Sequence, residues 1–237
     1  MRMSLIIPCF NEAPNLSLLL NRCSQSFANQ PDCELILVDN GSTDDTAVVL
    51  SRELPKYSFA RSVRVEVNRG YGFGILQGLK AADADVLAWT HADMQTDPAD
   101  ALRGFELFQA AGDPNRLFVK GRRYGRPAAD IVFTAGMAVF ETLLLRTSLW
   151  DINAQPTMFS KSFFNSWTNP PHDFSLDLFA YWNAKQQQLE IQRIPVMFSK
   201  RVHGQSSWNV NWSGKKKFIQ RTVDYSLKLR RELHRTI

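Results

Sequence analysis

The N-terminal half of the sequence alternates short apolar runs with segments of helical periodicity. Four runs rich in Val, Ile and Leu have the length and composition of buried strands: residues 3–8, 34–39, 63–68 and 85–90. The segments between them have the spacing of helices: residues 14–26, 43–54 and 72–82. Strands that alternate with helices in this way pair in parallel and are covered on both faces. The pattern therefore predicts an α/β fold with a mostly parallel central sheet flanked by helices.

Beyond residue 98 the pattern is less regular. It predicts helices over 98–111, 130–149 and 175–188, strands over 117–121 and 189–198, and a terminal helix from about Gly214. No internal repeat or Gly/Ser-rich linker divides the chain, so we expect one domain with its site at the C-terminal ends of the strands. The most apolar stretch, residues 131–150, is interrupted by Glu141 and Arg146. We expect it to pack on a core or lie at an interface rather than cross a bilayer.

The composition is that of a soluble globular protein. Of the 237 residues, 44% are hydrophobic and 22% charged, a balance that excludes a disordered chain, a collagen or a disulfide scaffold. Cys9, Cys23 and Cys33 are too few and too scattered for a disulfide framework or a zinc site. The first apolar run is short and ends at Pro8, unlike a signal peptide. We therefore expect a cytoplasmic protein in a reducing compartment.

Positive charge is concentrated near the C-terminus. Residues 214–237 carry eight Lys or Arg against two acidic residues, whereas the whole chain has a formal net charge of +5, so residues 1–213 are near neutral. Residues 213–237 are predicted to form a basic amphipathic helix, which suits a membrane leaflet. A solvated helix, or one that caps the core, is the alternative. Nucleic acid is a weaker candidate, because the basic residues form one helix and are not interleaved with stacking aromatics.

Each of the four N-terminal strands is followed by a loop with an unusual polar signature. These loops are PCFNE at 8–12, VDNGSTDDT at 38–46, NRGYGFGILQG at 68–78 and HADMQTDP at 91–98. In an open parallel sheet such loops meet at one edge, so we expect their acids to share a crevice: Glu12, Asp39, Asp44 and Asp93. A single Asp after a strand is often only a helix cap, but four such loops in register are harder to explain in that way.

Two common nucleotide-binding signatures are absent. The sequence has no G-x-x-x-x-G-K-[ST] loop, and Ile75 takes the place of the third glycine in G-x-G-x-x-G, which argues against a dinucleotide fold. The glycines of this segment suit a close backbone approach or a tight helix start. Asp93 and Gln95 are two residues apart, so an extended backbone would point both side chains to the same side. Oxygen ligands of this kind suit Mg²⁺ or Mn²⁺, which can bridge a diphosphate as it leaves.

Together with several later segments, these loops resemble the family 2 glycosyltransferases of the GT-A fold. The pattern is most similar to the branch of dolichyl or polyprenyl phosphate mannose and glucose synthases. The later segments are KGRRY at 120–124, DINAQPTMF at 151–159 and IPVMFSKRVHGQSSW at 194–208. The resemblance implies a single GT-A domain over residues 1–212, with a Rossmann-like nucleotide-sugar-binding half over 1–98 and an acceptor half over 99–212. The basic helix 213–237 follows it.

The resemblance also implies the roles of individual residues. Asp39 is expected to hydrogen-bond the base, and Asp93 and Gln95 match the metal-binding end of a D-x-D-x-Q element, which implies Mg²⁺ or Mn²⁺ as cofactor. His91 replaces the first acid of that element, and its neutral imidazole either contacts the nucleotide or weakens metal binding. The full set of residues implied to bind the nucleotide is Pro8, Asn11, Glu12, Asp39, Asp44, Gly72 and His91.

On the acceptor side, Arg123 and Arg201 match basic residues that grip the acceptor's phosphate in this branch. A surface ion pair is the alternative for either arginine. The branch has a further arginine in this region, near the position of Arg126, and the segments around 153–159 and Ser207 depart from the family pattern. A hydroxyl acceptor needs a general base, whereas a phosphate acceptor does not. The candidate bases are Asp151 and Asp173, and Asp173 also suits the start of a helix.

These observations predict a metal-dependent, inverting glycosyltransferase. It would move a sugar from a nucleotide-diphosphate sugar to a polyprenyl phosphate at the cytoplasmic face of the membrane. One alternative is a soluble family 2 glycosyltransferase that acts on a polysaccharide or another hydroxyl acceptor. A second alternative, which His91 suggests, is a non-catalytic nucleotide-sugar or membrane-binding module.

Overall fold

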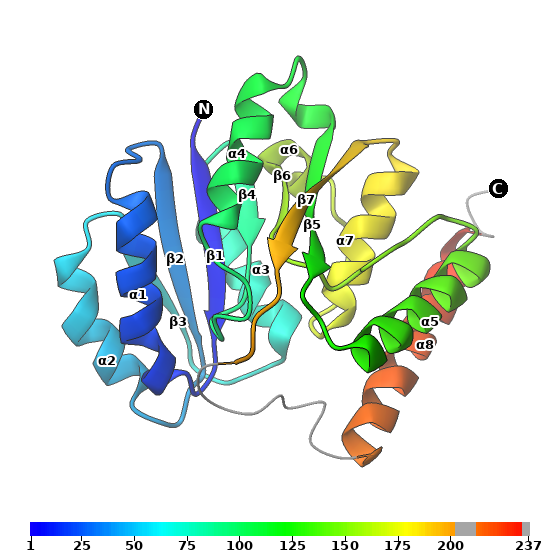
Figure 1. Cartoon of the computed structure of the whole chain (residues 1–237), viewed down its shortest axis with the longest axis horizontal. Helices are drawn as coiled ribbons and strands as arrows, with labels where there is room; N and C mark the ends of the chain where they lie inside the picture. The colour runs from blue at the N-terminus through cyan, green and yellow to red at the C-terminus, as the bar shows by residue number, and fades with distance from the viewer. Residues whose placement is uncertain (202–211, 234–237) are drawn as a thin grey trace.

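A seven-stranded sheet forms the centre of the computed structural model, which describes residues 1–201 and 212–233 (Figure 1). The strands are β1 (Met3–Cys9), β2 (Cys33–Asn40), β3 (Ala60–Val65), β4 (Val86–Trp89), β5 (Leu117–Tyr124), β6 (Thr157–Ser160) and β7 (Glu190–Met197). Their order across the sheet is β3-β2-β1-β4-β6-β5-β7. Neighbours are parallel except around β6, which is antiparallel to β4 and β5. The expected α/β fold with a mostly parallel sheet is confirmed.

Helices cover both faces of the sheet because side chains alternate along each strand. In β1, Leu5 and Ile7 pack in a core with residues of α1 (Ala13–Phe27) and α4 (Asp100–Ala110). Ile6, between them, packs in a second core with residues of α3 (Tyr71–Ala81) and α7 (Ser175–Gln186). Burial on both faces explains why the strands appear in the sequence as continuous apolar runs.

The remaining elements connect or flank these two cores. They are α2 (Thr46–Glu53), the 3-10 helices η1 (Leu54–Lys56) and η2 (Pro114–Arg116), α5 (Ala128–Leu145), α6 (Lys161–Asn165) and α8 (Trp212–Leu233). In Figure 1, α5 and α8 lie against each other at the end of the molecule away from α1 and α2. Leu145 of α5 and Leu229 of α8 are almost fully buried and belong to the same core as α3 and α7.

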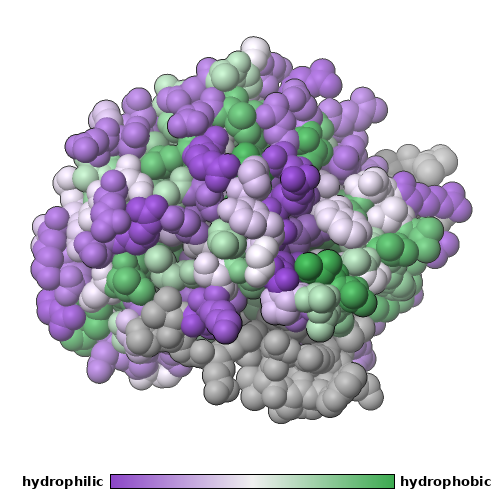
Figure 2. Space-filling model, viewed as in Figure 1, coloured by the Kyte–Doolittle hydropathy of each residue, from purple (hydrophilic) through white to green (hydrophobic). Residues whose placement is uncertain are grey.

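Helix α5 is apolar on its outer side as well. Among the helices described, it has the length and composition to cross a membrane, a criterion that the core helix of a soluble protein also meets. Only 17% of it is buried, however, so it is not a core helix. Its exposed apolar side chains are Ile131, Val132, Val139, Phe140 and Leu143. Figure 2 shows hydrophobic residues gathered on the surface at this end of the molecule.

The strands that precede the polar loops end at one edge of the sheet. β1 lies between β2 and β4 and is parallel to both, and Cys9 pairs with Asp39 in register. The loops that follow these three strands therefore lie next to one another. Asp39 and Asp93 are at the same edge, as the sequence predicts.

Three strands differ from the sequence prediction. β5, predicted over 117–121, continues to Tyr124, and β3, predicted over 63–68, occupies Ala60–Val65. A Cβ on Gly41 would lie 2.4 Å from the Asn68 nitrogen, so the chain has left the sheet by that point and crosses over Gly41. β6 was not predicted, because its four residues are all buried and show neither alternation nor the length of a typical strand.

Among the predicted helices, the bounds of α2 and α5 differ most from the prediction. α2 begins at Thr46 rather than at residue 43, since residues 43–45 belong to the loop that contacts Asn11. α5 ends at Leu145 rather than near residue 149, because Arg146 adopts a left-handed conformation with φ 50°.

Candidate active site

A cavity of about 720 Å³ lies at this edge of the sheet, between the strand-end loops and α5. Three kinds of side chain line it: polar, cationic and apolar. The strand-end loops contribute polar side chains, the end of β5 and the residues after it contribute Arg123 and Arg126, and α5 contributes an apolar wall that includes Phe133 and Met137. The predicted residues that line it are Pro8, Asn11, Glu12, His91, Asp93, Gln95, Arg123 and Arg201.

Asn11 ties the loops after β1 and β2 together. It adopts a left-handed conformation with φ 56°, which asparagine tolerates better than most residues. Its backbone N–H donates to the Ser42 hydroxyl at 3.0 Å, and its side-chain oxygen accepts from the Thr43 N–H at 2.8 Å. The neighbouring Glu12 N–H donates to the Thr46 hydroxyl at 3.0 Å. This end of the cavity is therefore preformed by hydrogen bonds between the two loops.

Asp39 and Asp44 brace the same loops. Asp39 is 2% exposed; one oxygen accepts from the Ser42 N–H at 3.0 Å, and the other lies 3.5 Å from the Arg64 guanidinium. Asp44 accepts from the Thr46 N–H at 3.0 Å, at the start of α2. The cavity lining does not include these two acids, so their contact with a nucleotide stays a prediction.

The carboxyl group of Glu12 faces other charges in the cavity. Burial and the nearby Asp93 raise its pKa, while a hydrogen bond from Asn15 and the charge of Arg201 partly offset the rise. Glu12 is thus electrostatically coupled to the residues predicted to hold the metal.

Gly72 allows a close approach between α3 and the segment before α7. A Cβ at this position would lie 2.6 Å from the Asp173 carbonyl oxygen and 2.8 Å from that of Pro171. The glycine therefore lets α3 approach the backbone before α7. The cavity lining does not include Gly72, so its predicted contact with a nucleotide stays a prediction.

Asp93 and Gln95 lie together in the cavity, but not on an extended backbone. Met94 has φ 57°, and the Gln95 N–H donates to Asp93 Oδ1 at 3.1 Å, so the loop is a tight turn. Arg201 contacts both side chains: its Nη2 lies 2.6 Å from Asp93 Oδ2, and its Nε donates to Gln95 Oε1 at 3.4 Å. The predicted metal ligands and one predicted phosphate ligand are thus in direct contact.

His91 belongs to an aromatic stack at the cavity wall. The Tyr71 ring stacks on His91 at 5.5 Å between centroids and on Phe174 at 4.6 Å. All three residues line the cavity. The imidazole is therefore positioned by stacking, next to the loop that holds Asp93.

A buried charged pair lies below this stack. Lys120 is fully buried, donates to the Thr157 hydroxyl at 2.7 Å and lies 3.7 Å from Asp177. Burial lowers the pKa of Lys120 to about 7, although Asp177 opposes the shift. Gln155 donates to Asp177 at 2.7 Å and to the Tyr71 hydroxyl at 3.4 Å, which connects the pair to the stack.

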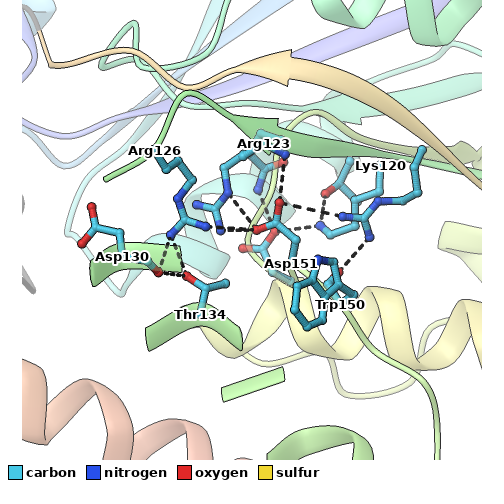
Figure 3. Close-up of polar contacts among 11 residues, drawn as sticks. Lys120, Arg123, Arg126, Asp130, Thr134, Trp150 and Asp151 are labelled. Carbon is cyan, nitrogen blue, oxygen red and sulfur yellow. Dashed lines mark hydrogen bonds and ion pairs between the residues drawn. The ribbon is translucent and has the colours of Figure 1, made fainter. Parts of the chain in front are cut away.

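Two arginines of the cavity wall converge on Asp151 (Figure 3). The carboxylate accepts from the Arg123 backbone N–H at 3.0 Å and from its Nε at 2.9 Å, and Arg126 Nη1 lies 3.7 Å away. Arg126 also donates to the Thr134 hydroxyl at 2.6 Å. Both guanidinium groups lie over the Phe198 ring, at 5.2 and 5.7 Å. The arginines are therefore held in fixed positions.

The position of Asp151 does not suit the role of an acceptor base. It is 4% exposed and lies behind the arginines rather than in the cavity lining. Burial alone would raise its pKa, but the hydrogen bonds and charge of Arg123 outweigh this and lower it. Asp173 accepts from the Ser175 N–H at 2.9 Å, at the start of α7, which agrees with its alternative role.

Two cavity residues carry functional groups that the sequence did not single out, Glu141 and Asp177. Arg126, which lies near the position of the branch's further arginine, also lines the cavity. Glu141 is fully buried, and neither of its oxygens has a hydrogen-bond partner within the described part of the chain. Burial raises its pKa to about 7, and the nearby Ser226 of α8 offsets only part of the rise. Its signal in the sequence is an acid inside an otherwise apolar helix. Ser207 and Trp208 lie outside the described residues.

Comparison with known proteins identifies the family. The sequence model of glycosyl transferase family 2 matches residues 4–181, which is most of the chain. The chain belongs to this family. The family 2 resemblance seen in the loops is thereby confirmed.

Two bacterial relatives illustrate the similarity. The undecaprenyl-phosphate 4-deoxy-4-formamido-L-arabinose transferase of Proteus mirabilis is 34% identical over 105 residues, which cover 43% of this chain and 32% of the relative. The dodecaprenyl-phosphate galacturonate synthase of Rhizobium johnstonii is 33% identical over 102 residues, covering 42% and 30%. In these alignments the chain spans about a third of the length of the curated relatives that it matches.

Solved structures share the GT-A fold. Glucosyl-3-phosphoglycerate synthase from Mycobacterium tuberculosis, in complex with Mn²⁺, UDP-glucose and phosphoglyceric acid, has a TM-score of 0.72 at 18% identity. The match covers 97% of this chain and 79% of that one. Staphylococcus aureus TarS has a TM-score of 0.61 at 16% identity, with 84% and 60% covered. At these identities the likeness establishes the fold alone.

Proposed function

We propose that this family 2 glycosyltransferase moves a sugar from a nucleotide-diphosphate sugar to the phosphate of a polyprenyl phosphate. The observation that carries the proposal is the placement of Arg123 and Arg126 in the same cavity as Asp93 and Gln95. Transfer between two phosphorylated substrates needs a site for a diphosphate and a cationic site for a second phosphate. The names of the two bacterial relatives, both polyprenyl-phosphate enzymes, support the same acceptor.

A phosphate acceptor fits the chemistry of the arginines better than a hydroxyl does. A phosphate oxygen is already anionic near neutral pH, so it can attack the anomeric carbon without a general base. The bond from that carbon to the diphosphate then breaks, and the nucleoside diphosphate leaves with the electron pair. Arg123 and Arg126 would hold the acceptor phosphate through fork-like hydrogen bonds. Asp151 would fix these arginines and would not itself remove a proton.

A divalent cation, Mg²⁺ or Mn²⁺, is part of the proposal. Such ions are commonly bound by one or two carboxylates together with substrate phosphates. Asp93 supplies one buried carboxylate in the cavity, and Gln95 supplies an amide oxygen beside it, so the donor set fits. When bound, the ion would neutralise the charge that develops on the leaving diphosphate. The Mn²⁺ and UDP-glucose in the complex of the Mycobacterium tuberculosis enzyme support this assignment.

The nucleotide would occupy the end of the cavity formed by residues 1–98. Pro8, Asn11 and Glu12 line this end, and Asp39, which accepts from the Ser42 N–H of the adjoining loop, would hydrogen-bond the base. The acceptor half would extend over residues 99–212, of which 202–211 lie outside the described residues. An inverting outcome follows from a single displacement at the anomeric carbon.

The acceptor would be reached at the cytoplasmic face of the membrane. The outer side of α5 exposes apolar residues that include Val132 and Leu143, at 72% and 75%. Its neighbour α8 carries exposed basic residues: Arg221, Lys228, Arg230 and Arg231. An apolar face beside basic side chains suits the headgroup layer of an anionic leaflet. The membrane contact would therefore involve α5 together with the basic C-terminal helix.

The proposal is tested by incubating the protein with radiolabelled nucleotide sugars, Mn²⁺ and undecaprenyl phosphate. We expect label in the organic phase with one donor, and loss of that product in Asp93→Ala and Arg126→Ala. Arg116→Ala, an exposed arginine in η2, is the matched control.

Two outcomes would overturn the proposal. Label that appears only in a water-soluble glycan indicates the hydroxyl-acceptor alternative. Donor binding by calorimetry, without turnover on any acceptor, indicates a non-catalytic nucleotide-sugar module.

A further inference from the structure

Arg201 covers the two side chains that fit a divalent cation. Its guanidinium lies 2.6 Å from Asp93 Oδ2 and 3.4 Å from Gln95 Oε1. The second oxygen of Asp93 accepts from the Gln95 N–H at 3.1 Å. Both oxygens of the only carboxylate in the predicted D-x-D-x-Q element are therefore engaged, since His91 stands at the other acidic position.

This contact competes with a cation for the same oxygens. The charges of Asp93 and Arg201 cancel. While this ion pair is formed, it therefore offers a divalent ion little electrostatic attraction. A cation on Asp93 Oδ2 would also lie against a guanidinium of like charge. Cation binding and the Asp93–Arg201 ion pair are thus mutually opposed.

The backbone segment that carries Arg201 also connects the loop of Asp93 to the strand that carries Arg123. The Ser199 N–H donates to the Gln95 carbonyl at 2.7 Å, and the Phe198 N–H donates to the Tyr124 carbonyl at 2.9 Å. The segment 198–201 therefore joins the loop of Asp93 to the end of β5, where Arg123 and Arg126 lie over Phe198. The Arg201 side chain is 27% exposed, whereas those of Arg123 and Arg126 are 10% exposed. Of these three arginines, Arg201 is the least enclosed.

We propose that Arg201 occupies the place of the cation in the donor-free protein and is displaced when the divalent ion arrives with the diphosphate. Once displaced, Arg201 joins Arg123 and Arg126 at the acceptor's phosphate. The donor complex therefore completes the acceptor site, and the two substrates bind in that order. This inference rests on the proposed function and adds a coupling between its two substrate sites.

Mn²⁺ binding, measured by the loss of the free-ion electron paramagnetic resonance signal, tests the competition without any turnover. We expect Arg201→Gln to bind Mn²⁺ about tenfold more tightly than the wild type, with or without UDP, because the competing charge is gone. Arg126→Gln removes a charge from the same cavity without touching Asp93, and its Mn²⁺ affinity should stay within about twofold of the wild type.

Calorimetry with a short, water-soluble prenyl phosphate tests the coupling. In the wild type, we expect Mn²⁺ and UDP to tighten binding of this acceptor analogue by about fivefold or more, and in Arg201→Gln we expect no such gain. Equal Mn²⁺ affinity in the wild type and Arg201→Gln, or a rise in Mn²⁺ affinity in Arg126→Gln as large as that in Arg201→Gln, overturns the competition and leaves the transferase proposal intact. An undiminished gain in acceptor binding in Arg201→Gln overturns the coupling. Absence of Mn²⁺ binding in every variant, even with UDP, overturns the metal assignment and this inference together.

Discussion

Asp151 is the shared counterion of three neighbouring arginines, Arg123, Arg126 and Arg193. It binds Arg123 through the backbone and the side chain, and it lies 3.7 Å from Arg126 and 4.0 Å from Arg193. Three buried or half-buried guanidinium groups next to one another would repel without it. The residual positive charge of this group is what would attract a phosphate.

Replacing Asp151→Asn keeps the size of the side chain but removes its charge. Because the arginines lose their buried counterion, we expect the free energy of unfolding to fall by about 3 kcal/mol at neutral pH. Inorganic phosphate should stabilise the variant more than the wild type, since phosphate can take over the role of counterion. Urea denaturation and thermal melting, with phosphate or chloride at equal ionic strength, measure both effects.

The same carboxylate predicts a dependence on pH. Its pKa is lowered in the folded protein, so its stabilising contribution is present above about pH 4 and is lost as the pH falls toward the lowered value. The difference in the free energy of unfolding between the wild type and Asp151→Asn should therefore become smaller at acidic pH. The exposed Asp32→Asn is the control, and a variant that phosphate stabilises no more than the wild type would contradict the counterion role.

At the residue scale, the position of a residue after a strand predicted part of the cavity lining, since Glu12 and Asp93 line it and Asp39 and Asp44 do not. It did not predict which of these side chains contact one another. Asn11, Asp93 and Gln95 each follow a strand that ends at the same edge, so parallel topology alone brings them together. Gln95 and Arg201, however, are 106 residues apart, and their contact depends on how the segment after β7 crosses the sheet edge. No local pattern contains that information.

At the element scale, α5 has one face toward the cavity and another toward solvent. Ala138, Glu141 and Leu145 are buried at intervals of three and four residues, which is the period of one helix face. The opposite side exposes apolar residues and no charge between Ile131 and Leu145. The sequence predicted the helix from its apolar length, but with so few polar residues it did not mark which face is buried.

The burial of Glu141 in α5 predicts that stability depends on pH. Its pKa is raised from 4.5 to about 7 by burial, so folding is unaffected by this group below about pH 4.5 and increasingly penalised as the pH rises to about 7. We expect Glu141→Gln to raise the free energy of unfolding by roughly 2–3 kcal/mol at pH 8 and by much less at pH 5. Denaturation at the two pH values measures this, with the exposed Glu106→Gln as control. Equal effects at both pH values would show that ionisation of Glu141 is not the cause.

The exposed face of α5 predicts membrane binding by a defined surface. Val132→Asp combined with Leu143→Asp places two charges on that face without touching the cavity. We expect its affinity for vesicles of anionic phospholipid, measured by flotation, to fall about tenfold or more, because each charge must be kept out of the apolar layer. Val48→Asp, which adds one charge at an exposed valine of α2, should float like the wild type. Unchanged flotation of the double variant would exclude α5 from the contact.

At the scale of the whole molecule, one cavity extends from the polar strand-end loops to the apolar wall of α5. The strand-end loops form a polar end around Asn11 and Asp93. α5 and α8, which lie against each other away from α1 and α2, form the other, partly apolar end (Figure 1). The sequence predicted where the first end lies, since this follows from the order of strands and helices, although Asp39 and Asp44 were also expected in the crevice and do not line the cavity. The second end depends on β6, which reverses direction between β4 and β5 and is too short to be recognised from its pattern.

Because the exposed face of α5 lies outside the cavity, a change on that face should slow sugar transfer to an acceptor in a membrane but not to one dissolved in water. If α5 only brings the cavity to the bilayer, the Val132→Asp, Leu143→Asp variant should transfer sugar to undecaprenyl phosphate in vesicles about tenfold more slowly than the wild type. With a short prenyl phosphate dissolved in water, its rate should stay within about twofold, because the arginines and Asp93 are unchanged. Arg126→Ala, by contrast, should lose activity with both acceptors. Equal losses of the α5 variant on the two acceptors would mean that this face supports the cavity itself rather than its approach to the membrane.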